Sequence, residues 1–308
     1  VLAGVRQADL GEAMTTVEPR PATKDELTRV HSATFVDAIE AFCRKGGGSL
    51  DPDTTVGEES WDAALLAAGA GLDAIERLDR GEAAAAFCAV RPPGHHATPS
   101  RAMGFCLFNN IAVAAAALAD RGERVLVVDF DAHHGNGTQD AFYRDPRVVY
   151  VSMHEYPLYP GTGRIDEVGA GEGAGATINL PFPYGTAGDA YLAAIDEVVV
   201  RAAARLQPTW LLLSAGFDAH RRDPLTGLGL TSGDYADITT RLIELAPPGR
   251  RLVFLEGGYD LQALRDSTAA CLAALCGEEH RPEPASTGGR GREVVAAALK
   301  VHGELGDF

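Results

Sequence analysis

The chain has 308 residues, of which 46% are hydrophobic and 23% are charged, a composition that excludes a disordered or fibrous protein. It has no apolar run of about 18 residues and no charged segment followed by an apolar block, so it predicts neither a membrane span nor a signal peptide. The 27 basic and 43 acidic residues give a formal net charge of −16, which disfavours direct nucleic-acid binding and favours a cationic substrate or partner.

Short apolar runs alternate with longer segments of helical spacing. The glycine-rich, acidic segment 46–57 predicts a surface loop. Buried strands are predicted at 83–90, 124–130, 148–151, 177–180, 210–214 and 251–255. Helices are predicted at 109–120, 189–206, 232–245 and 261–276, with a loop over 278–292 before a last helix at 293–301. This alternation predicts an α/β fold with a central parallel β-sheet flanked by helices on both faces. We interpret residues 1–308 as a single domain and, because Val1 is not Met, expect a missing N-terminal segment.

Polar residues follow four of the predicted strands directly. Ligands bind beyond the carboxyl ends of strands in an open parallel sheet. We therefore expect one rim of the sheet to collect the residues at these ends, which are His95, His96, Asp131, His133, Asp218 and Tyr259.

Three of these residues suggest a metal site. Asp131 and His133 are two apart at a strand end, where side-chain alternation sends both to the same side. Asp218 supplies a third ligand from another strand end. Three protein ligands leave a coordination position open for water, as in catalytic sites. Zn²⁺ is the first prediction, and Fe²⁺ also accepts such a mixed set.

A metal-bound water needs a base for its proton, and the leaving amine needs an acid. His95 and His96 are the candidates. Asp129 and Asn136 flank the metal ligands and are the candidate partners that orient the two imidazoles. Tyr259 follows two glycines and is placed to stabilise an oxyanion on the substrate.

Each feature also has an ordinary structural explanation. A buried His is usually a hydrogen-bonded core group, and Asp218 alone could be a helix N-cap. Four such coincidences at strand ends are improbable together. We assign a structural or solvated role to the remaining histidines outside the motifs, His31, His154, His220, His280 and His302.

Five cysteines without Cys-x-x-Cys spacing predict neither a disulfide framework nor a thiolate zinc site. We therefore expect the protein to lie in a reducing cytoplasm. Most of its cysteines are expected to be small buried apolar residues.

The ordered motifs resemble the signature of the histone deacetylase superfamily over about residues 22–305. The matching segments are Arg91-Pro92-Pro93-Gly94-His95-His96-Ala97, Gly104-Phe105-Cys106-Leu107-Phe108-Asn109-Asn110, Val128-Asp129-Phe130-Asp131-Ala132-His133-His134-Gly135-Asn136-Gly137, Tyr159-Pro160-Gly161-Thr162-Gly163, Ser214-Ala215-Gly216-Phe217-Asp218 and Glu256-Gly257-Gly258-Tyr259. The first motif and Asn136 are more similar to the class II branch and its bacterial homologues, which include acetylpolyamine amidohydrolases. The resemblance implies the arginase/deacetylase-like fold.

The resemblance also implies a zinc-dependent hydrolysis of an N-acetyl amide to acetate and free amine. Zinc would be held by Asp131, His133 and Asp218. His96 would serve as general base and acid, and His95 would assist electrostatically.

The same resemblance gives roles to residues around the histidines. Asp129 would orient His95, and Asn136, a neutral residue where class I members have Asp, would orient His96 with less bias toward its protonated form. Tyr259 would polarise the substrate carbonyl.

Substrate contacts and potassium sites are implied as well. Gly104, Phe105 and Tyr159 would line a narrow tunnel for the acyl-lysine stem, with Leu225 near its rim. Potassium ions are implied at two positions, which are Asp129, Asp131, His133, Ser152 and Met153 for the first and Phe142, Asp145 and Val148 for the second. The family's N-terminal segment, with its His-Pro-Glu-type motif, is expected to be missing from this sequence.

Several alternatives stay open. Our first hypothesis for the substrate is acetyl-lysine in proteins or peptides, and our second is acetylpolyamine or another small N-acyl amide. An arginase-like ureohydrolase needs a second metal, but Gly135 and Gly216 stand where its extra carboxylates would be. A silent acyl-lysine or polyamine binder would have lost Tyr259, His96 or a metal ligand.

Overall fold

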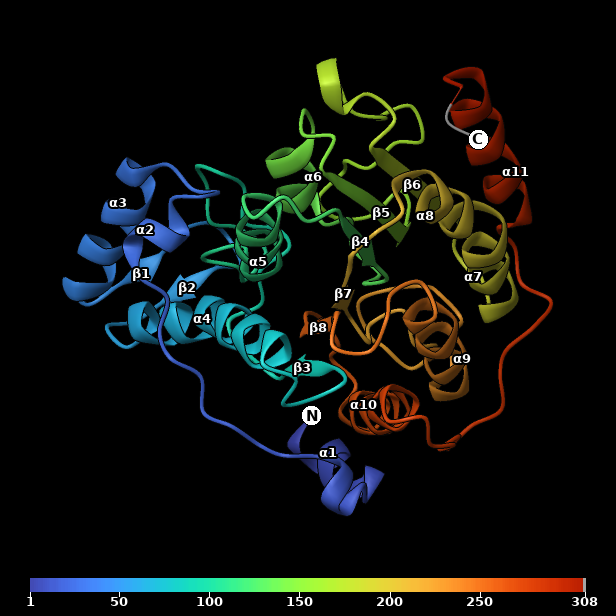
Figure 1. The fold of residues 1–308 in the computed structure, drawn as a ribbon, viewed down its shortest axis with the longest axis horizontal. Helices are drawn as coiled ribbons and strands as arrows, with labels where there is room; N and C mark the ends of the chain where they lie inside the picture. The colour runs from blue at the N-terminus through green and yellow to red at the C-terminus, as the bar shows by residue number, and fades with distance from the viewer. Residues whose placement is uncertain (307–308) are drawn as a thin grey trace.

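The computed structural model describes residues 1–306 and is built around a six-stranded parallel sheet (Figure 1). The strand order is β3-β8-β7-β4-β5-β6, and every neighbouring pair is parallel. The strands are β3 (Ala86–Cys88), β4 (Val125–Asp129), β5 (Val148–Glu155), β6 (Thr177–Phe182), β7 (Trp210–Ala215) and β8 (Arg251–Leu255). The four strands followed by the motif residues, β3, β8, β7 and β4, are therefore consecutive neighbours in the sheet.

Continuous apolar strands place this sheet between two hydrophobic cores. In β4, Val125 and Val127 belong to one core cluster, and Leu126 and Val128 belong to the other. Because successive side chains of a strand point to opposite faces, an uninterrupted apolar strand requires cover on both faces. This is the two-faced α/β fold predicted from the sequence.

Helices cover the two faces, as Figure 1 shows. On one face, α4 (Ser60–Asp79) and α5 (Asn110–Ala119) contribute to the cluster that contains Val125. On the other face, the cluster with Leu126 receives side chains from α7 (Gly188–Ala194), α8 (Val200–Leu206), α9 (Ser232–Ile243), α10 (Leu261–Leu275) and α11 (Arg292–Glu304). A short helix, α6 (Asn136–Phe142), follows the β4 loop.

Helix starts follow local capping chemistry. The Asn109 side chain accepts the Ala112 backbone N–H at 3.0 Å and begins α5. Thr231 begins α9 with a capping box that includes Asp234. Such caps satisfy N–H groups that have no partner within the helix.

The N-terminal elements pack against the helices that cover the sheet. α1 (Leu2–Ala8) packs on α10, and a short 3-10 turn follows at Gly11–Ala13. α2 (Lys24–Leu27) and α3 (Ala33–Arg44) share a third apolar cluster with α4, centred on Trp61 and Phe108.

Several predicted boundaries were wrong. Segment 46–57 is not all loop, because β1 (Gly48–Ser49) and β2 (Thr55–Val56) pair as an antiparallel hairpin. The helix predicted at 189–206 begins at Gly188 and contains a π-helical turn at Ile195–Val199. A 3-10 turn that was not predicted lies before β6, at Gly171–Gly173. β5 continues four residues beyond the predicted end at 151, to Glu155, and β3 occupies only three of the predicted eight residues.

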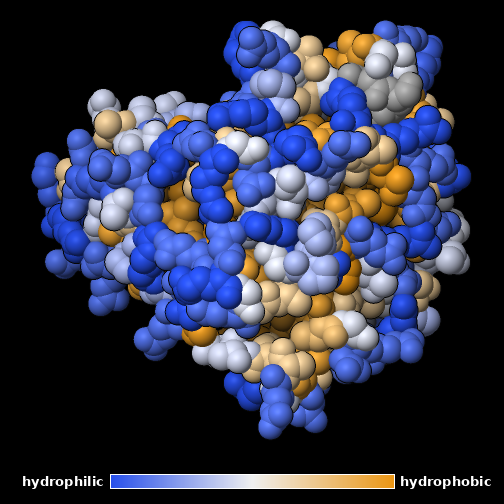
Figure 2. Space-filling model, viewed as in Figure 1, coloured by the Kyte–Doolittle hydropathy of each residue, from blue (hydrophilic) through white to orange (hydrophobic). Residues whose placement is uncertain are grey.

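Four of the five cysteines are buried, and all five are free thiols. Within residues 1–306, no helix combines the length and apolarity needed to cross a membrane. Polar side chains dominate the outline of the face in Figure 2, and apolar side chains gather toward its middle.

Candidate metal centre and catalytic site

Asp131, His133 and Asp218 converge at the carboxyl end of the sheet. One ligand atom from each lies within 4.8 Å of the others. His133 Nδ1 lies 2.9 Å from Asp218 Oδ2 and 3.3 Å from Asp131 Oδ1. The three side chains therefore present two oxygens and one nitrogen to a common point.

The donor chemistry of this cluster fits a divalent cation. Asp131 and Asp218 are buried, and their ion pairs in the described structure are made to histidines alone. Burial and then the charge of Asp131 raise the pKa of Asp218. Burial lowers the pKa of His133, but its bonds to Asp131 and Asp218 outweigh burial and raise the pKa to about 11. A cation at this point would replace that proton and offset both carboxylates.

The reason for this convergence differs from the predicted one. β4 ends at Asp129 and β7 at Ala215, so Asp131, His133 and Asp218 lie in the loops that follow. Strand alternation therefore does not orient them. Hydrogen bonds from backbone N–H groups to the carboxylates hold the loops instead. Asp131 Oδ1 accepts the His133 N–H at 2.8 Å, and Asp218 Oδ1 accepts the Ala132 N–H at 2.8 Å.

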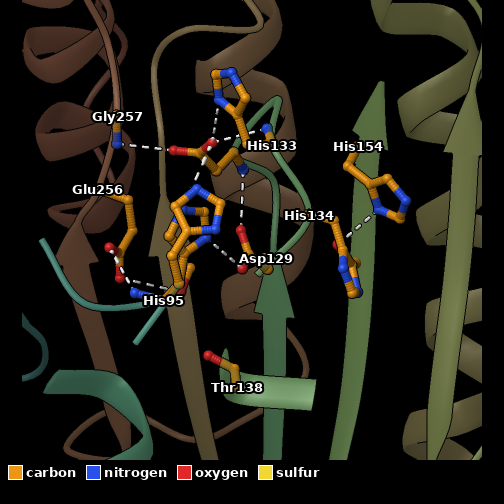
Figure 3. Close-up of polar contacts among 12 residues, drawn as sticks. His95, Asp129, His133, His134, Thr138, His154, Glu256 and Gly257 are labelled. Carbon is orange, nitrogen blue, oxygen red and sulfur yellow. Dashed lines mark hydrogen bonds and ion pairs between the residues drawn. The ribbon is translucent and has the colours of Figure 1, made fainter. Parts of the chain in front are cut away.

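His95 and His96 lie beside the metal cluster in the turn after β3, with each imidazole held by its predicted partner. His95 Nδ1 lies 3.0 Å from Asp129 Oδ2, and His96 Nδ1 lies 2.9 Å from Asn136 Oδ1 (His95 and Asp129 are labelled in Figure 3). An amide oxygen accepts only, so His96 Nδ1 carries hydrogen and leaves Nε2 with a free lone pair.

The two imidazoles differ in charge preference. Burial lowers the pKa of His95, but Asp129, Asp131 and Glu256 outweigh it and raise the pKa to about 10. Burial and the neighbouring charge of His95 hold the pKa of His96 well below its usual range. The surroundings thus favour the protonated form of His95 and the neutral form of His96.

Aromatic side chains surround the approach to these groups. The Tyr159 ring stands edge-on to His96, with centroids 5.1 Å apart, and the Phe105 and Tyr259 centroids are 6.2 Å apart. Burial, followed by the charges of Asp218 and Asp131, raises the pKa of Tyr259, so its phenol stays protonated as a hydrogen-bond donor. Leu225 is half exposed.

The wall formed by Phe105 has an unusual backbone. Its φ is 64°, in the left-handed region that few non-glycine residues adopt. The Phe105 N–H donates to Thr54 Oγ1 at 3.0 Å, so the β1–β2 hairpin region holds the backbone of this residue. Gly104, with φ 57°, lies against the His96 ring, where an added Cβ would collide.

Two glycines lie against the side chains of this site. A Cβ at Gly216 would collide with the Asp131 carboxylate, and a Cβ at Gly135 would collide with Asp129 and Tyr150. A carboxylate side chain at either position would therefore require Asp131 or Asp129 to move. This packing supports the argument against a two-metal ureohydrolase.

The residues of the two predicted potassium positions are also placed by the fold. Asp129 pairs with Ser152 across β4 and β5, and Met153 O accepts the Tyr191 hydroxyl at 3.2 Å. At the second position, the Asp145 carboxylate binds Arg147 at 2.7 Å, between α6 and β5. Potassium at either position stays a prediction.

Four polar residues around the site had no predicted role. Glu256 and Asp223 accept backbone N–H groups of the catalytic segments, Thr54 holds Phe105, and Tyr150 donates to Asp129 Oδ2 at 3.0 Å. Only Glu256 had a sequence signal, because it lies within a motif at a strand end.

Comparisons with known proteins agree with this geometry. The family described as "Histone deacetylase domain" matches residues 1–275. A probable deacetylase of Archaeoglobus fulgidus is 40% identical over 271 residues, which cover 86% of this chain and 75% of that protein. A probable deacetylase of Methanothermobacter thermautotrophicus is 43% identical over 293 residues, which cover 94% and 87%.

A solved structure is similar over almost the whole chain. The crystal structure of the HDA15 HD domain superposes with a TM-score of 0.90 at 38% identity and covers 98% of this chain and 85% of that one. The shared fold, the matched sequence and the metal-type cluster at the strand ends lead to one conclusion. The chain belongs to the histone deacetylase family, whose named members are enzymes that hydrolyse amide bonds.

Proposed function

We propose that this protein is a zinc-dependent deacetylase that hydrolyses N-acetylated amines, with acetyl-lysine in peptides or proteins as its substrate. The observation that carries the proposal is the convergence of Asp131, His133 and Asp218 within 4.8 Å, beside two oriented histidines. When bound there, the cation would polarise the amide carbonyl and lower the pKa of a water molecule to about 7.

The protein's own groups then divide the proton transfers. His96 Nε2 accepts a proton from the attacking water and returns it to the leaving amine. His95, kept cationic by Asp129, stabilises the negative charge that develops. Tyr259 donates a hydrogen bond to the carbonyl oxygen as it becomes an oxyanion.

The approach to these groups suits a linear apolar stem. Phe105 and Tyr159 supply two aromatic walls, and Leu225 adds an exposed apolar side chain. Asp51 and Asp53 lie beside Thr54, whose hydroxyl holds Phe105. With the net charge of −16, these carboxylates favour a substrate that is cationic beyond its acyl group.

A substrate comparison tests the proposal. The zinc-loaded protein is assayed with an acetyl-lysine peptide, acetylputrescine and acetylspermidine, and Tyr259→Phe is the control. We expect the highest kcat/KM for the peptide and a large loss in the variant. Higher kcat/KM for the acetylpolyamines would replace the substrate assignment, and no turnover of any of them by metal-loaded protein would favour a binding protein.

The same proposal places the enzyme in the cytoplasm. Its support is the five free thiols of the described chain, four of them buried. Potassium at the two positions between β4, α6 and β5 belongs to the proposal as well. Titration of the zinc-loaded protein with potassium, read out as thermal stability at constant ionic strength, tests it.

A further inference from the structure

Glu256 reaches from the end of β8 to the segment that carries the two histidines. Its Oε2 accepts the Gly94 N–H at 2.7 Å and the His95 N–H at 3.1 Å. Figure 3 shows this carboxylate directed at the His95 backbone, while the Gly257 N–H next to it points away toward the metal cluster. Glu256 is buried, and Ser214 Oγ lies 3.4 Å from its other oxygen.

The carbonyl group of His95 is held as well. The His95 carbonyl accepts the N–H groups of Gly137 and Thr138, at 3.0 and 3.2 Å, at the start of α6. Glu256, at the end of β8, holds the peptide group before His95, and α6 holds the peptide group after it, so two separate elements fix the backbone on either side of this residue. Without Glu256, only the carbonyl side would be held.

The segment after β8 thus serves three parts of the site. Glu256 holds the histidine turn, Gly257 N–H donates to Asp131 Oδ2 at 2.8 Å, and Tyr259 faces Phe105. These contacts fix the general base, a metal ligand and the phenol relative to one short stretch of backbone. A displacement of about 1 Å between such groups costs about a hundredfold in rate.

From this geometry we propose that Glu256 is a positioning residue for the deacetylation reaction, and that it acts by accepting the Gly94 and His95 N–H groups and so fixing His95 and His96 against Tyr259. The inference rests on the proposed function, because it concerns the rate of that reaction. The role requires an acceptor oxygen at the right reach. It does not require the negative charge, because Asp129 and Asp131 contribute more than Glu256 to the raised pKa of His95 and remain in its absence.

Two conservative variants separate reach from charge. Glu256→Gln keeps an acceptor oxygen at the same distance and removes the charge, whereas Glu256→Asp keeps the charge and shortens the reach by one methylene. We expect Glu256→Gln to retain kcat within about fivefold and Glu256→Asp to lose about ten- to a hundredfold in kcat. KM should change less than about threefold in both, because neither variant alters the substrate walls.

Asp234→Asn is the matched control. Asp234 is also a buried carboxylate that accepts two backbone N–H groups, those of Thr231 and Ser286, at 2.8 and 2.9 Å, but it lies at the start of α9 and outside the site. Its kcat should equal that of the wild type even if its thermal stability falls. Zinc content is measured for every variant and should stay at the wild-type value.

Amide hydrogen exchange gives a readout besides activity. Gly94 and His95 N–H groups should be protected in the wild type and Glu256→Gln, and they should exchange faster in Glu256→Asp. Wild-type kcat in Glu256→Asp, equal losses in both Glu256 variants, or an equal loss in Asp234→Asn would overturn the inference. A wild-type protein that binds zinc and turns over no acetyl amine would instead remove the proposed function, and the exchange pattern would still test the contact.

Discussion

The carboxylate of Asp223 holds the backbone of Tyr259. Asp223 Oδ2 accepts the Tyr259 N–H at 2.8 Å, and its Oδ1 accepts the Leu225 N–H at 3.0 Å. Asp223 is buried. One side chain thus fixes both the residue that supplies the phenol and a residue at the rim of the substrate approach.

Asp223→Ala should therefore lower kcat about ten- to a hundredfold, because the phenol loses its fixed position relative to the carbonyl. The decisive measurement is a double-mutant cycle with Tyr259→Phe. Once the phenol is absent, Asp223→Ala should cost less than about threefold in kcat. Losses that multiply fully in the double variant would show that Asp223 acts independently of Tyr259.

Removal of a metal ligand and removal of the base should have different signatures. Asp218→Ala should abolish zinc binding and activity together, because the remaining two ligands leave an incomplete site. His96→Ala should keep zinc and lose about a hundred- to ten-thousandfold in kcat. Metal analysis of the dialysed proteins, done beside the kinetics, checks both. Zinc retained at the wild-type level in Asp218→Ala would remove that residue from the ligand set.

Substrate affinity should depend on the hairpin residue Thr54. Thr54→Val removes the acceptor for the Phe105 N–H and so loosens the left-handed backbone conformation that carries the ring. We expect KM for the acetyl-lysine peptide to rise several-fold, about the effect of one lost hydrogen bond, with kcat nearly unchanged.

Thr55→Val is the control for this change, because Thr55 lies on the same hairpin, is exposed, and its hydroxyl contacts only Ser49 in the described part of the chain. Equal KM values for the two valine variants would show that Thr54 does not hold the substrate wall.

The sequence predicted those strands and helices that a short stretch of residues is enough to specify. β4, β7 and β8 were found within one or two residues because each is a continuous apolar run ended by a polar residue. α4 was not predicted, although it is the longest helix of the described chain. Its buried positions are mostly alanine and glycine, which give a weak apolar period, and packing against α5 decides the structure.

Site residues were predictable where they belong to a motif that directly follows a predicted strand. His95, Asp131 and Tyr259 are such cases. Thr54 and Asp223 were not predictable, since each acts on a segment that is distant in sequence, through a backbone N–H that any residue would supply. Contacts of this kind depend on loop paths, and the sequence pattern does not encode those paths.

His31 should make the stability of the protein depend on pH. Its Nδ1 lies 3.0 Å from Thr98 O, and its Nε2 accepts the Asn109 N–H at 2.9 Å. A second ring hydrogen would meet the Asn109 N–H, so the folded protein requires the neutral tautomer. Burial lowers the pKa of His31 to about 4.

The unfolded chain binds this proton near pH 6.5, and the folded chain binds it only near pH 4. The stability contributed by His31 is therefore fully present above about pH 6.5 and is lost as the pH falls toward 4. Between pH 7 and pH 5 the loss is on the order of 2 kcal/mol.

His31→Gln provides the test, because glutamine keeps a donor and an acceptor and does not titrate in this range. Denaturant unfolding of both proteins at pH 5 and pH 7 gives the four free energies needed. The variant should be less stable than the wild type at pH 7, yet its free energy of unfolding should fall less between pH 7 and pH 5, by roughly the amount assigned to His31. The rest of the chain is the same in both proteins, so only the difference between the two pH dependences reports on this residue. Identical pH dependences would mean that the folded protein accepts the second proton on His31 without cost.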